Sequence, residues 1–150
     1  MKDKEYYMEL AIKEAKKAAL EDEVPVGCVI VKNGEVIAKT HNKTIRNNNC
    51  YSHAELLAIQ KALKKLNQTY LNDCELYVTL EPCMMCAGMI SNARINKLYF
   101  GAYDEKGGFI ESKINIKEIK HIGAYPREVN GGLCKDKCAN ILSTFFRGKR

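Results

Sequence analysis

Two short motifs in this chain combine three side chains that can bind zinc with one free carboxylate. His53 begins a His-Ala-Glu segment, and Cys83 and Cys86 belong to a Pro-Cys-Met-Met-Cys segment. One imidazole and two thiolates leave the fourth position of a tetrahedral zinc ion for water, which is typical of catalytic zinc. Glu55, two residues after His53, is too close to be a convenient fourth ligand and is the candidate proton carrier. The combination predicts zinc-dependent hydrolysis.

Each motif lies where the sequence predicts the start of a helix. Ser52 is expected to cap a helix whose first turn carries His53 and Glu55. Pro82 is expected to open a second helix, with both cysteines in its first turn and three residues apart on one face. The unpaired N–H groups and the helix dipole at such a position favour thiolate over thiol. Both sulfurs are therefore expected to reach one ion.

Each motif alone has a simpler explanation. Ser52 and Glu55 also fit a capping box, in which Glu55 bonds to the Ser52 backbone N–H and His53 has no special role. A Cys-x-x-Cys pair could be a redox pair or half of a structural zinc site. The two motifs together favour one catalytic Zn²⁺ per chain, bound by His53, Cys83 and Cys86.

Composition suits one globular domain over residues 1–150, because 46% of the residues are hydrophobic and the core needs no disulfides. Neither an apolar signal-peptide core nor an apolar stretch of membrane-spanning length occurs, so we expect a cytoplasmic location without a membrane partner. The remaining cysteines are then expected to be reduced thiols. Cys134 and Cys138, four residues apart, could join a second metal site, but burial as small apolar residues is favoured.

The charge balance is compatible with a polyanionic partner. The formal net charge of +6 and the pI of about 8.9 permit such a partner without requiring one. Near the chain end, Phe145 and Phe146 lie beside the basic segment 147–150, a mixture of aromatic and cationic groups that suits nucleic acid. The simpler explanation is packing at the end of a helix, with at least one of the two phenylalanines buried.

Hydrophobic periodicity predicts helices interleaved with strands. The expected helices cover residues 4–21, 53–66, 83–92 and 133–147, and the expected strands cover residues 27–31, 35–39, 75–80, 97–102 and 126–129. Asn33-Gly34 predicts a hairpin between the first two strands, and residues 103–112 are expected to form a loop. We therefore expect a three-layer α/β domain around a mixed sheet of about five strands. In it the opening hairpin is antiparallel and strands joined by helical crossovers are parallel. The zinc ligands should then meet at helix N-termini beside the sheet's carboxyl edge.

Segments spread over nearly the whole chain resemble the cytidine and deoxycytidylate deaminase superfamily, and within it the family of tRNA-specific adenosine deaminases. The most specific segment is Thr-Leu-Glu-Pro-Cys-Met-Met-Cys-Ala-Gly at residues 79–88. His53 excludes those relatives that have a third cysteine in its place. The other similar segments are residues 23–27, 53–55, 77–78, 94–95, 100–102 and 145–147.

The resemblance implies a cytidine-deaminase-like fold and hydrolytic deamination of adenosine to inosine at the wobble position of a tRNA anticodon. It also implies a homodimer whose partner helps to hold the anticodon stem-loop. In the implied mechanism, His53, Cys83 and Cys86 bind zinc, and a zinc-bound hydroxide attacks the ring carbon that bears the amine. Glu55 carries the protons between the water, the ring nitrogen and the departing amine.

Residue by residue, the resemblance also implies contacts with the RNA substrate. Asn42 is expected to contact the purine, and Val26 and Ala54 to wall the base pocket. Asp104 is expected to meet the anticodon nucleotides, and the chain end that contains Phe145 and Arg147 to lie near the RNA. Residues 49–52 and 107–110 depart from the usual family pattern close to these positions.

Two other functions fit the same motifs. A small-molecule deaminase of guanine, cytosine or a free nucleoside would use the same metal and Glu55 but would need no basic chain end. An RNA-binding zinc protein with an inert site would have no chemical need for Glu55.

Overall fold

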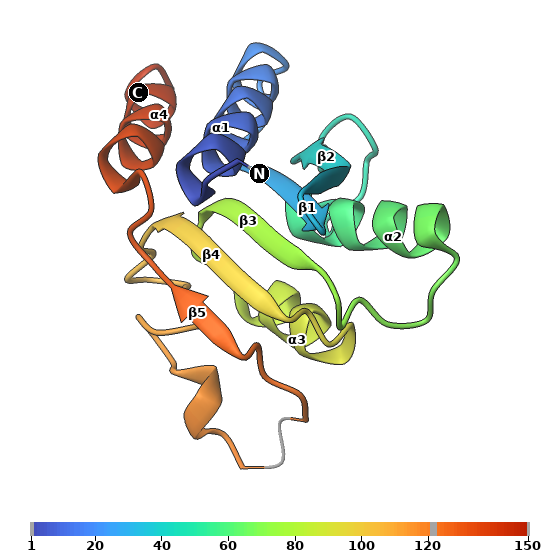
Figure 1. Ribbon diagram of the computed structural model, residues 1–150. Helices are drawn as coiled ribbons and strands as arrows, with labels where there is room; N and C mark the ends of the chain where they lie inside the picture. Colours follow the sequence, from blue (N-terminus) through green and yellow to red (C-terminus); the bar gives the residue numbers. More distant parts are fainter. Residues whose placement is uncertain (1, 121–122, 150) are drawn as a thin grey trace.

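The computed structural model describes residues 2–120 and 123–149, so residue 150 of the basic chain end lies outside it. A five-stranded sheet lies between two layers of helices (Figure 1). Helices α1 (Lys4–Leu20) and α4 (Lys135–Arg147) cover one face, and helices α2 (Ala54–Leu66) and α3 (Met84–Asn92) cover the other. The predicted three-layer α/β fold is confirmed.

The sheet is mixed, as predicted, but its strand order was not foreseen. Strand β1 is antiparallel to both β2 and β3, whereas β3, β4 and β5 are parallel to one another. Helix α2 carries the chain across β1, so β2 and β3 run in the same direction with β1 between them. The carboxyl ends of β2, β3 and β4 consequently share one edge of the sheet. In spatial order the strands are β2 (Glu35–His41), β1 (Gly27–Lys32), β3 (Glu75–Leu80), β4 (Lys97–Ala102) and β5 (Glu128–Asn130).

The starts of the two site helices differ by one residue from the prediction. Helix α2 is capped at His53 rather than Ser52, and helix α3 is capped at Cys83, so Pro82 precedes the helix instead of opening it. Neither cap residue bonds to its own helix through its side chain. The Ser52 N–H donates to the Asn49 carbonyl at 3.1 Å, so the capping-box alternative for Glu55 is not formed. The side chains of both cap residues instead belong to the cluster of metal ligands.

Small residues set the distance between the sheet and the layer of α1 and α4. A Cβ atom added at Gly27 would lie 1.9 Å from the Ala11 carbonyl oxygen of α1. One added at Gly101 would lie 2.4 Å from the sulfur of Cys138, which is buried in the core as expected. The first strand therefore begins directly against α1, close to the edge where the metal motifs lie.

The end of α4 differs from the prediction. Phe145 is half-buried and Phe146 is 48% exposed, so the expectation that at least one of them is buried is wrong. Their rings pack edge to face on each other, with centroids 5.3 Å apart, because the last turn of α4 extends beyond the sheet it covers. Helix α4 also begins two residues later than expected, at Lys135, and β5 begins two residues and ends one residue later than expected.

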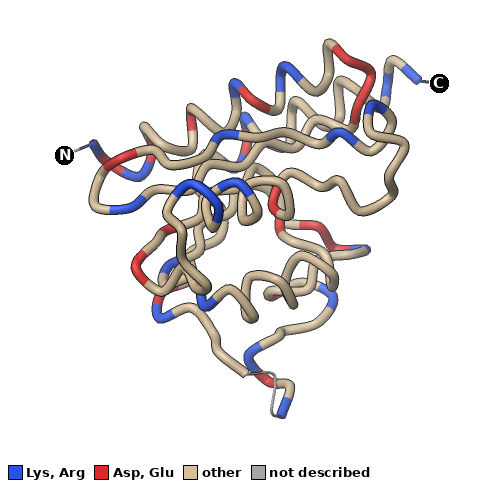
Figure 2. Tube along the Cα trace, turned by 90° about the vertical axis from the view of Figure 1, so that its right-hand side faces the viewer, with Lys and Arg blue, Asp and Glu red and all other residues tan. Residues whose placement is uncertain are grey.

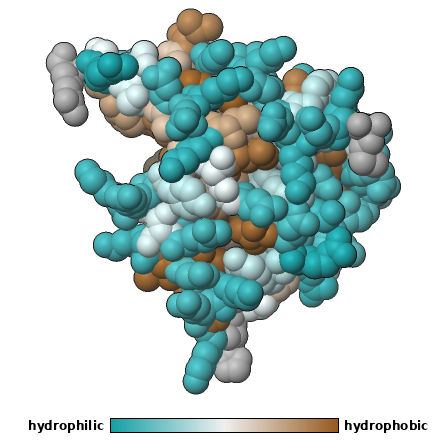
Figure 3. All heavy atoms as spheres, turned by 60° about the vertical axis from the view of Figure 1, so that its left-hand side comes forward, coloured by the Kyte–Doolittle hydropathy of each residue, from teal (hydrophilic) through white to brown (hydrophobic). Residues whose placement is uncertain are grey.

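The surface mixes charges of both signs. Lys and Arg occur along the whole visible trace in Figure 2, with Asp and Glu between them. On the face shown in Figure 3 most side chains are hydrophilic, and the hydrophobic ones form small separate groups. The five cysteines outside the metal motifs are free thiols, as expected. Among the described residues, none of the helices has the length and apolar character needed to cross a membrane.

Candidate active site

The two predicted metal motifs meet at the carboxyl edge of the sheet. The Nδ1 atom of His53 lies 3.7 Å from the Cys83 sulfur and 3.6 Å from the Cys86 sulfur. All three ligand atoms lie within 4.8 Å of one another. They come together because α2 and α3 follow parallel-running strands and begin side by side at the same edge. The sequence-based prediction of the ligand cluster is confirmed.

The electrostatics of the two sulfurs favour a bound cation. The Cys83 thiolate accepts a hydrogen bond from the Cys86 thiol and lies beside His53, which lowers the pKa of Cys83 to about 4. The same contact, together with burial, raises the pKa of Cys86. Two thiolates this close repel each other unless a cation neutralises them. One imidazole and two sulfurs form the donor set that suits a single zinc ion.

Glu55 lies in the first turn of α2, buried beside the ligand cluster. Only 4% of its surface is exposed. The loss of solvent on burial is the main reason why its pKa is raised to about 7. A carboxyl group that titrates near neutral pH accepts and returns protons with little driving force lost in either direction. Its environment therefore suits a proton carrier.

A cavity of about 240 Å³ opens onto His53, Glu55 and Cys83. Three of the residues expected to contact substrate, Val26, Asn42 and Asp104, lie in its wall. Ala54 is fully buried and does not line the cavity, and its N–H donates to the Asn42 side-chain oxygen at 2.8 Å. The full lining is Val24, Val26, Asn42, Thr44, His53, Glu55, Leu80, Glu81, Cys83 and Asp104.

Phe145 and Arg147 do not line this cavity. The Arg147 side chain bonds to the Ser143 carbonyl and the Thr144 hydroxyl of its own helix. However, Lys149 forms an ion pair with Asp22, in the turn that leads from α1 to the cavity residue Val24. The chain end thus lies beside a segment that enters the site, although these two side chains are not part of it.

A larger hollow, of about 780 Å³, lies at the opposite edge of the sheet, at the amino ends of β3 and β4. Its walls include the packed rings of Tyr7, Tyr77 and Tyr99. The metal-ligand cluster found among the described residues does not border it. The chemistry therefore belongs to the smaller cavity.

Two buried glutamates, to which the sequence analysis assigned no role, hold the loops that border the cavity. The Glu23 carboxylate accepts hydrogen bonds from the N–H groups of Ile45 and Arg46, at 3.1 and 2.8 Å, and from the Thr44 hydroxyl at 3.2 Å. These bonds fix the loop between β2 and α2. A charged residue between a predicted helix and a predicted strand gave no signal of this function.

Glu81 has the same function on the other side of the cavity. Its carboxylate accepts from the N–H of Asp104 at 3.1 Å, from three consecutive N–H groups of residues 110–112 at 2.7 to 3.2 Å, and from the Ser112 hydroxyl. Burial acts to raise the pKa of Glu81, but these bonds outweigh it and the pKa is lowered. A Cβ atom added at Gly108 would lie 2.4 Å from this carboxylate, which explains one glycine of the unusual segment 107–110.

Comparisons of the whole chain with known proteins agree with the geometry of the site. The family model of the MafB19-like deaminases matches residues 2–150. The tRNA-specific adenosine deaminase of Agrobacterium fabrum is 45% identical over 150 residues, which are 100% of this chain and 98% of that protein. The chain belongs to the MafB19-like deaminases, in the tRNA-specific adenosine deaminase family. The family member from Bacillus subtilis is 44% identical, over 100% of this chain and 92% of that protein.

A solved structure supports the same family. It comes from biochemical and structural studies of A-to-I editing by tRNA:A34 deaminases at the wobble position of transfer RNA. Its chain superimposes with a TM-score of 0.89 and 45% sequence identity, covering 91% of this chain and 99% of that one. The fold and the ligand cluster of this family member are therefore those of a zinc deaminase.

We expect the purified protein to hold one zinc ion per chain and the Cys83→Ala variant to hold almost none, because the remaining two donors cannot enclose the ion. Cys50→Ala is the matched control, since Cys50 is an exposed thiol. Elemental analysis after dialysis measures the ratio. Full zinc occupancy in Cys83→Ala would contradict the assigned ligand set.

We expect Glu81→Gln to loosen residues 103–112, because an amide replaces a carboxylate that accepts several bonds, each worth about 1.5–3 kcal/mol when charged. Hydrogen exchange of these N–H groups should speed up, whereas Glu111→Gln, an exposed change in the same loop, should have little effect.

The same bonds predict a pH dependence. Since the folded-state pKa of Glu81 is lowered, its stabilisation is complete above the ordinary value of 4.5 and is lost as the pH falls through the lower folded value. If Glu81→Gln leaves the hydrogen-exchange rates of residues 103–112 unchanged, the role of Glu81 in holding this loop is contradicted.

Proposed function

We propose that this protein, as a single domain, deaminates adenosine to inosine at the wobble position of a tRNA anticodon in the cytoplasm. One observation carries the proposal: the buried Glu55 and the His53, Cys83 and Cys86 cluster border one small cavity. They do so in a chain that is 45% identical, over its full length, to a tRNA-specific adenosine deaminase.

The chain's own residues divide the work of the reaction. His53, Cys83 and Cys86 would hold zinc, which when bound supplies a Lewis acid that activates water toward the ring carbon bearing the amine. Glu55 accepts a proton from the water and passes it to the adjacent ring nitrogen. It then takes the proton of the newly added hydroxyl and delivers it to the departing amine, so that ammonia leaves and a carbonyl remains. Its pKa of about 7 suits both directions of transfer.

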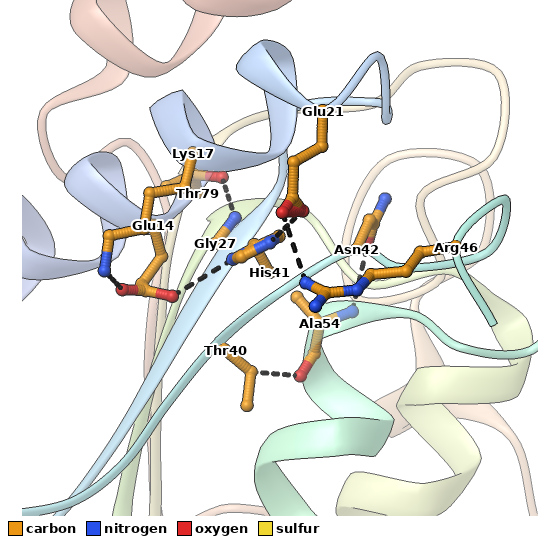
Figure 4. A network of polar contacts seen from close by, with 10 residues as sticks. All are labelled: Glu14, Lys17, Glu21, Gly27, Thr40, His41, Asn42, Arg46, Ala54 and Thr79. Atoms are coloured by element: carbon orange, nitrogen blue, oxygen red, sulfur yellow. Dashed lines mark hydrogen bonds and ion pairs between the residues drawn. The ribbon is translucent and has the colours of Figure 1, made fainter.

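The size and walls of the cavity support a single inserted base. A volume of about 240 Å³ is small for a ligand pocket, and enzymes that act on a base take it out of its stack into a close-fitting pocket. Loop nucleotides are extruded at lower cost than paired ones. Asn42 holds Ala54 through its oxygen, and its amide nitrogen points away from Ala54, as Figure 4 shows. We assign that nitrogen to the purine and Val26 to the pocket wall. Ala54, fully buried, supports the wall through its bond to Asn42 and does not line the cavity itself.

Asp104 and the chain end would contact the rest of the RNA. Asp104 borders the cavity from the loop held by Glu81 and is assigned to neighbouring anticodon nucleotides. Phe145 and Arg147 lie near the end of α4, which the Lys149–Asp22 pair ties to the segment entering the site. An aromatic ring beside cations suits unpaired nucleotides. The net charge of +6 favours the same partner.

We expect Glu55→Gln to retain one zinc per chain and to lose between about 10² and 10⁴ in the rate of inosine formation, because the amide cannot carry protons. The assay uses an anticodon stem-loop with a wobble adenosine, and Glu111→Gln is the control for an exposed glutamate. A rate close to wild type in the purified, zinc-loaded variant would refute the assigned role.

We also propose a homodimer. Tyr51 and Met84, each within two residues of a metal ligand, are 52% and 67% exposed, and Ile45 in the neighbouring loop is 67% exposed. Large apolar side chains exposed beside a site are typical of interaction surfaces. Light scattering should give about twice the chain mass of 17.0 kDa. A mass of one chain at micromolar concentration would contradict the dimer.

A further inference from the structure

Two side chains at the end of β2 grip the same residue of α2. The Thr40 hydroxyl donates to the Ala54 carbonyl oxygen at 2.7 Å, and the Asn42 side-chain oxygen accepts from the Ala54 N–H at 2.8 Å (Figure 4). Both contacts are buried. Ala54 is thus held at its N–H and at its C=O by side chains from another element.

The gripped residue lies between the metal ligand His53 and the proton carrier Glu55. Because His53 uses its side chain for the metal site, it leaves the first N–H groups of α2 without a local cap. Asn42 provides that cap across the fold. Thr40 adds a bond to a carbonyl that already belongs to the first turn of the helix. Fixing both ends of Ala54 therefore fixes the backbone on which His53 and Glu55 are mounted.

His41, between the two gripping residues, points to the opposite face of the strand, as alternation requires. Its Nδ1 atom lies 3.2 Å from a Glu14 carboxylate oxygen, and its Nε2 atom lies 2.8 Å from a Glu21 carboxylate oxygen. Glu14 lies in the second half of α1, and Glu21 is the residue that follows the helix. The two carboxylates are also paired with Lys17, at 2.8 Å, and with Arg46, at 3.2 Å, as Figure 4 shows.

The network connects α1 to the site through one short piece of strand. His41 and Glu14 are each less than a tenth exposed, so the anchor is shielded from solvent on the α1 side. His41 anchors the end of β2 to α1, and its neighbours Thr40 and Asn42 reach Ala54 from this anchored strand end. The positions of the metal ligand and the proton carrier therefore depend on contacts with α1 as well as on their own helix.

We propose that Thr40 and His41 are positioning residues of the active site. Thr40 holds the Ala54 carbonyl, and His41 holds the end of β2 against α1, so that together they fix His53 and Glu55 relative to Cys83 and Cys86. Groups that orient metal ligands without touching the metal commonly change affinity or activity by about 10- to 100-fold when removed. The effect on turnover rests on the proposed function, whereas the effect on zinc retention does not.

Thr40→Val removes the hydroxyl and keeps the branched shape of the side chain. In the zinc-loaded protein we expect zinc transfer to a chromogenic chelator to become about 10-fold faster or more, and kcat on the stem-loop to fall while KM stays close to wild type. Thr40→Ser, which keeps the donor, should restore both values. Thr69→Val is the matched control, because Thr69 is exposed and distant from the site in the sequence.

His41→Phe tests the anchor, since it removes both ring bonds and keeps a planar side chain. If His41 acts through Thr40, the double variant should release zinc no faster than the more affected single variant, whereas independent effects would multiply. Thermal unfolding is measured on every variant. If the two effects on the zinc-release rate multiply, and each follows the loss of thermal stability of its variant, His41 is merely structural and its assignment is overturned.

The outcomes separate the two proposals. Zinc release that is unchanged in folded Thr40→Val overturns the positioning role, whatever the turnover. Failure of the wild-type protein to form inosine would overturn the proposed function and leave the zinc-release comparison valid. Should Thr40→Val not fold, Thr40→Ala is compared with Thr40→Ser in the same way, and equal release rates in that pair contradict the proposal.

Discussion

The structure depends on bringing two sulfurs and one imidazole to a single point at the ends of two helices. The three ligand atoms lie within 4.8 Å of one another, and the Cys83 and Cys86 sulfurs cannot both ionise there without a cation. The mixed sheet makes this meeting possible. Since β2 and β3 run in the same direction, the helices that follow them begin at the same edge. The fold brings the three ligand atoms together, and a bound zinc ion would neutralise the charge of the two thiolates.

Buried carboxylates of similar burial acquire different properties from their partners. Glu81 accepts several N–H bonds from one loop, and these bonds lower its pKa and keep it charged. Glu55 has lost solvent with less compensation, so its pKa rises to about 7 and its proton becomes exchangeable near neutral pH. Glu23 fixes the other bordering loop through backbone N–H groups. Hydrogen bonding thus distinguishes Glu23 and Glu81, which fix the loops that border the cavity, from Glu55, the proposed proton carrier.

The sequence predicted what local patterns encode. The hairpin at Asn33-Gly34, the site helices and the ligand cluster all follow from spacing and periodicity, and all are present. The position of β1 between β2 and β3 was not predictable, because strand order depends on contacts far apart in the chain. The cap of α2 was also missed, since Asn42 supplies it from a different element. Local rules assign a cap to the preceding serine and cannot find a partner 12 residues away.

The most direct measurement is product analysis with the zinc-loaded protein. Ammonia release and inosine formation are compared between an anticodon stem-loop carrying a wobble adenosine and free adenosine, adenine, guanine and cytosine. The proposed function, in which one base of the stem-loop enters the cavity and the chain end contacts the rest of the RNA, predicts inosine in the stem-loop and no turnover of the free compounds. Turnover of a free base or nucleoside, with the stem-loop unchanged, would contradict the tRNA substrate and make the protein a small-molecule deaminase.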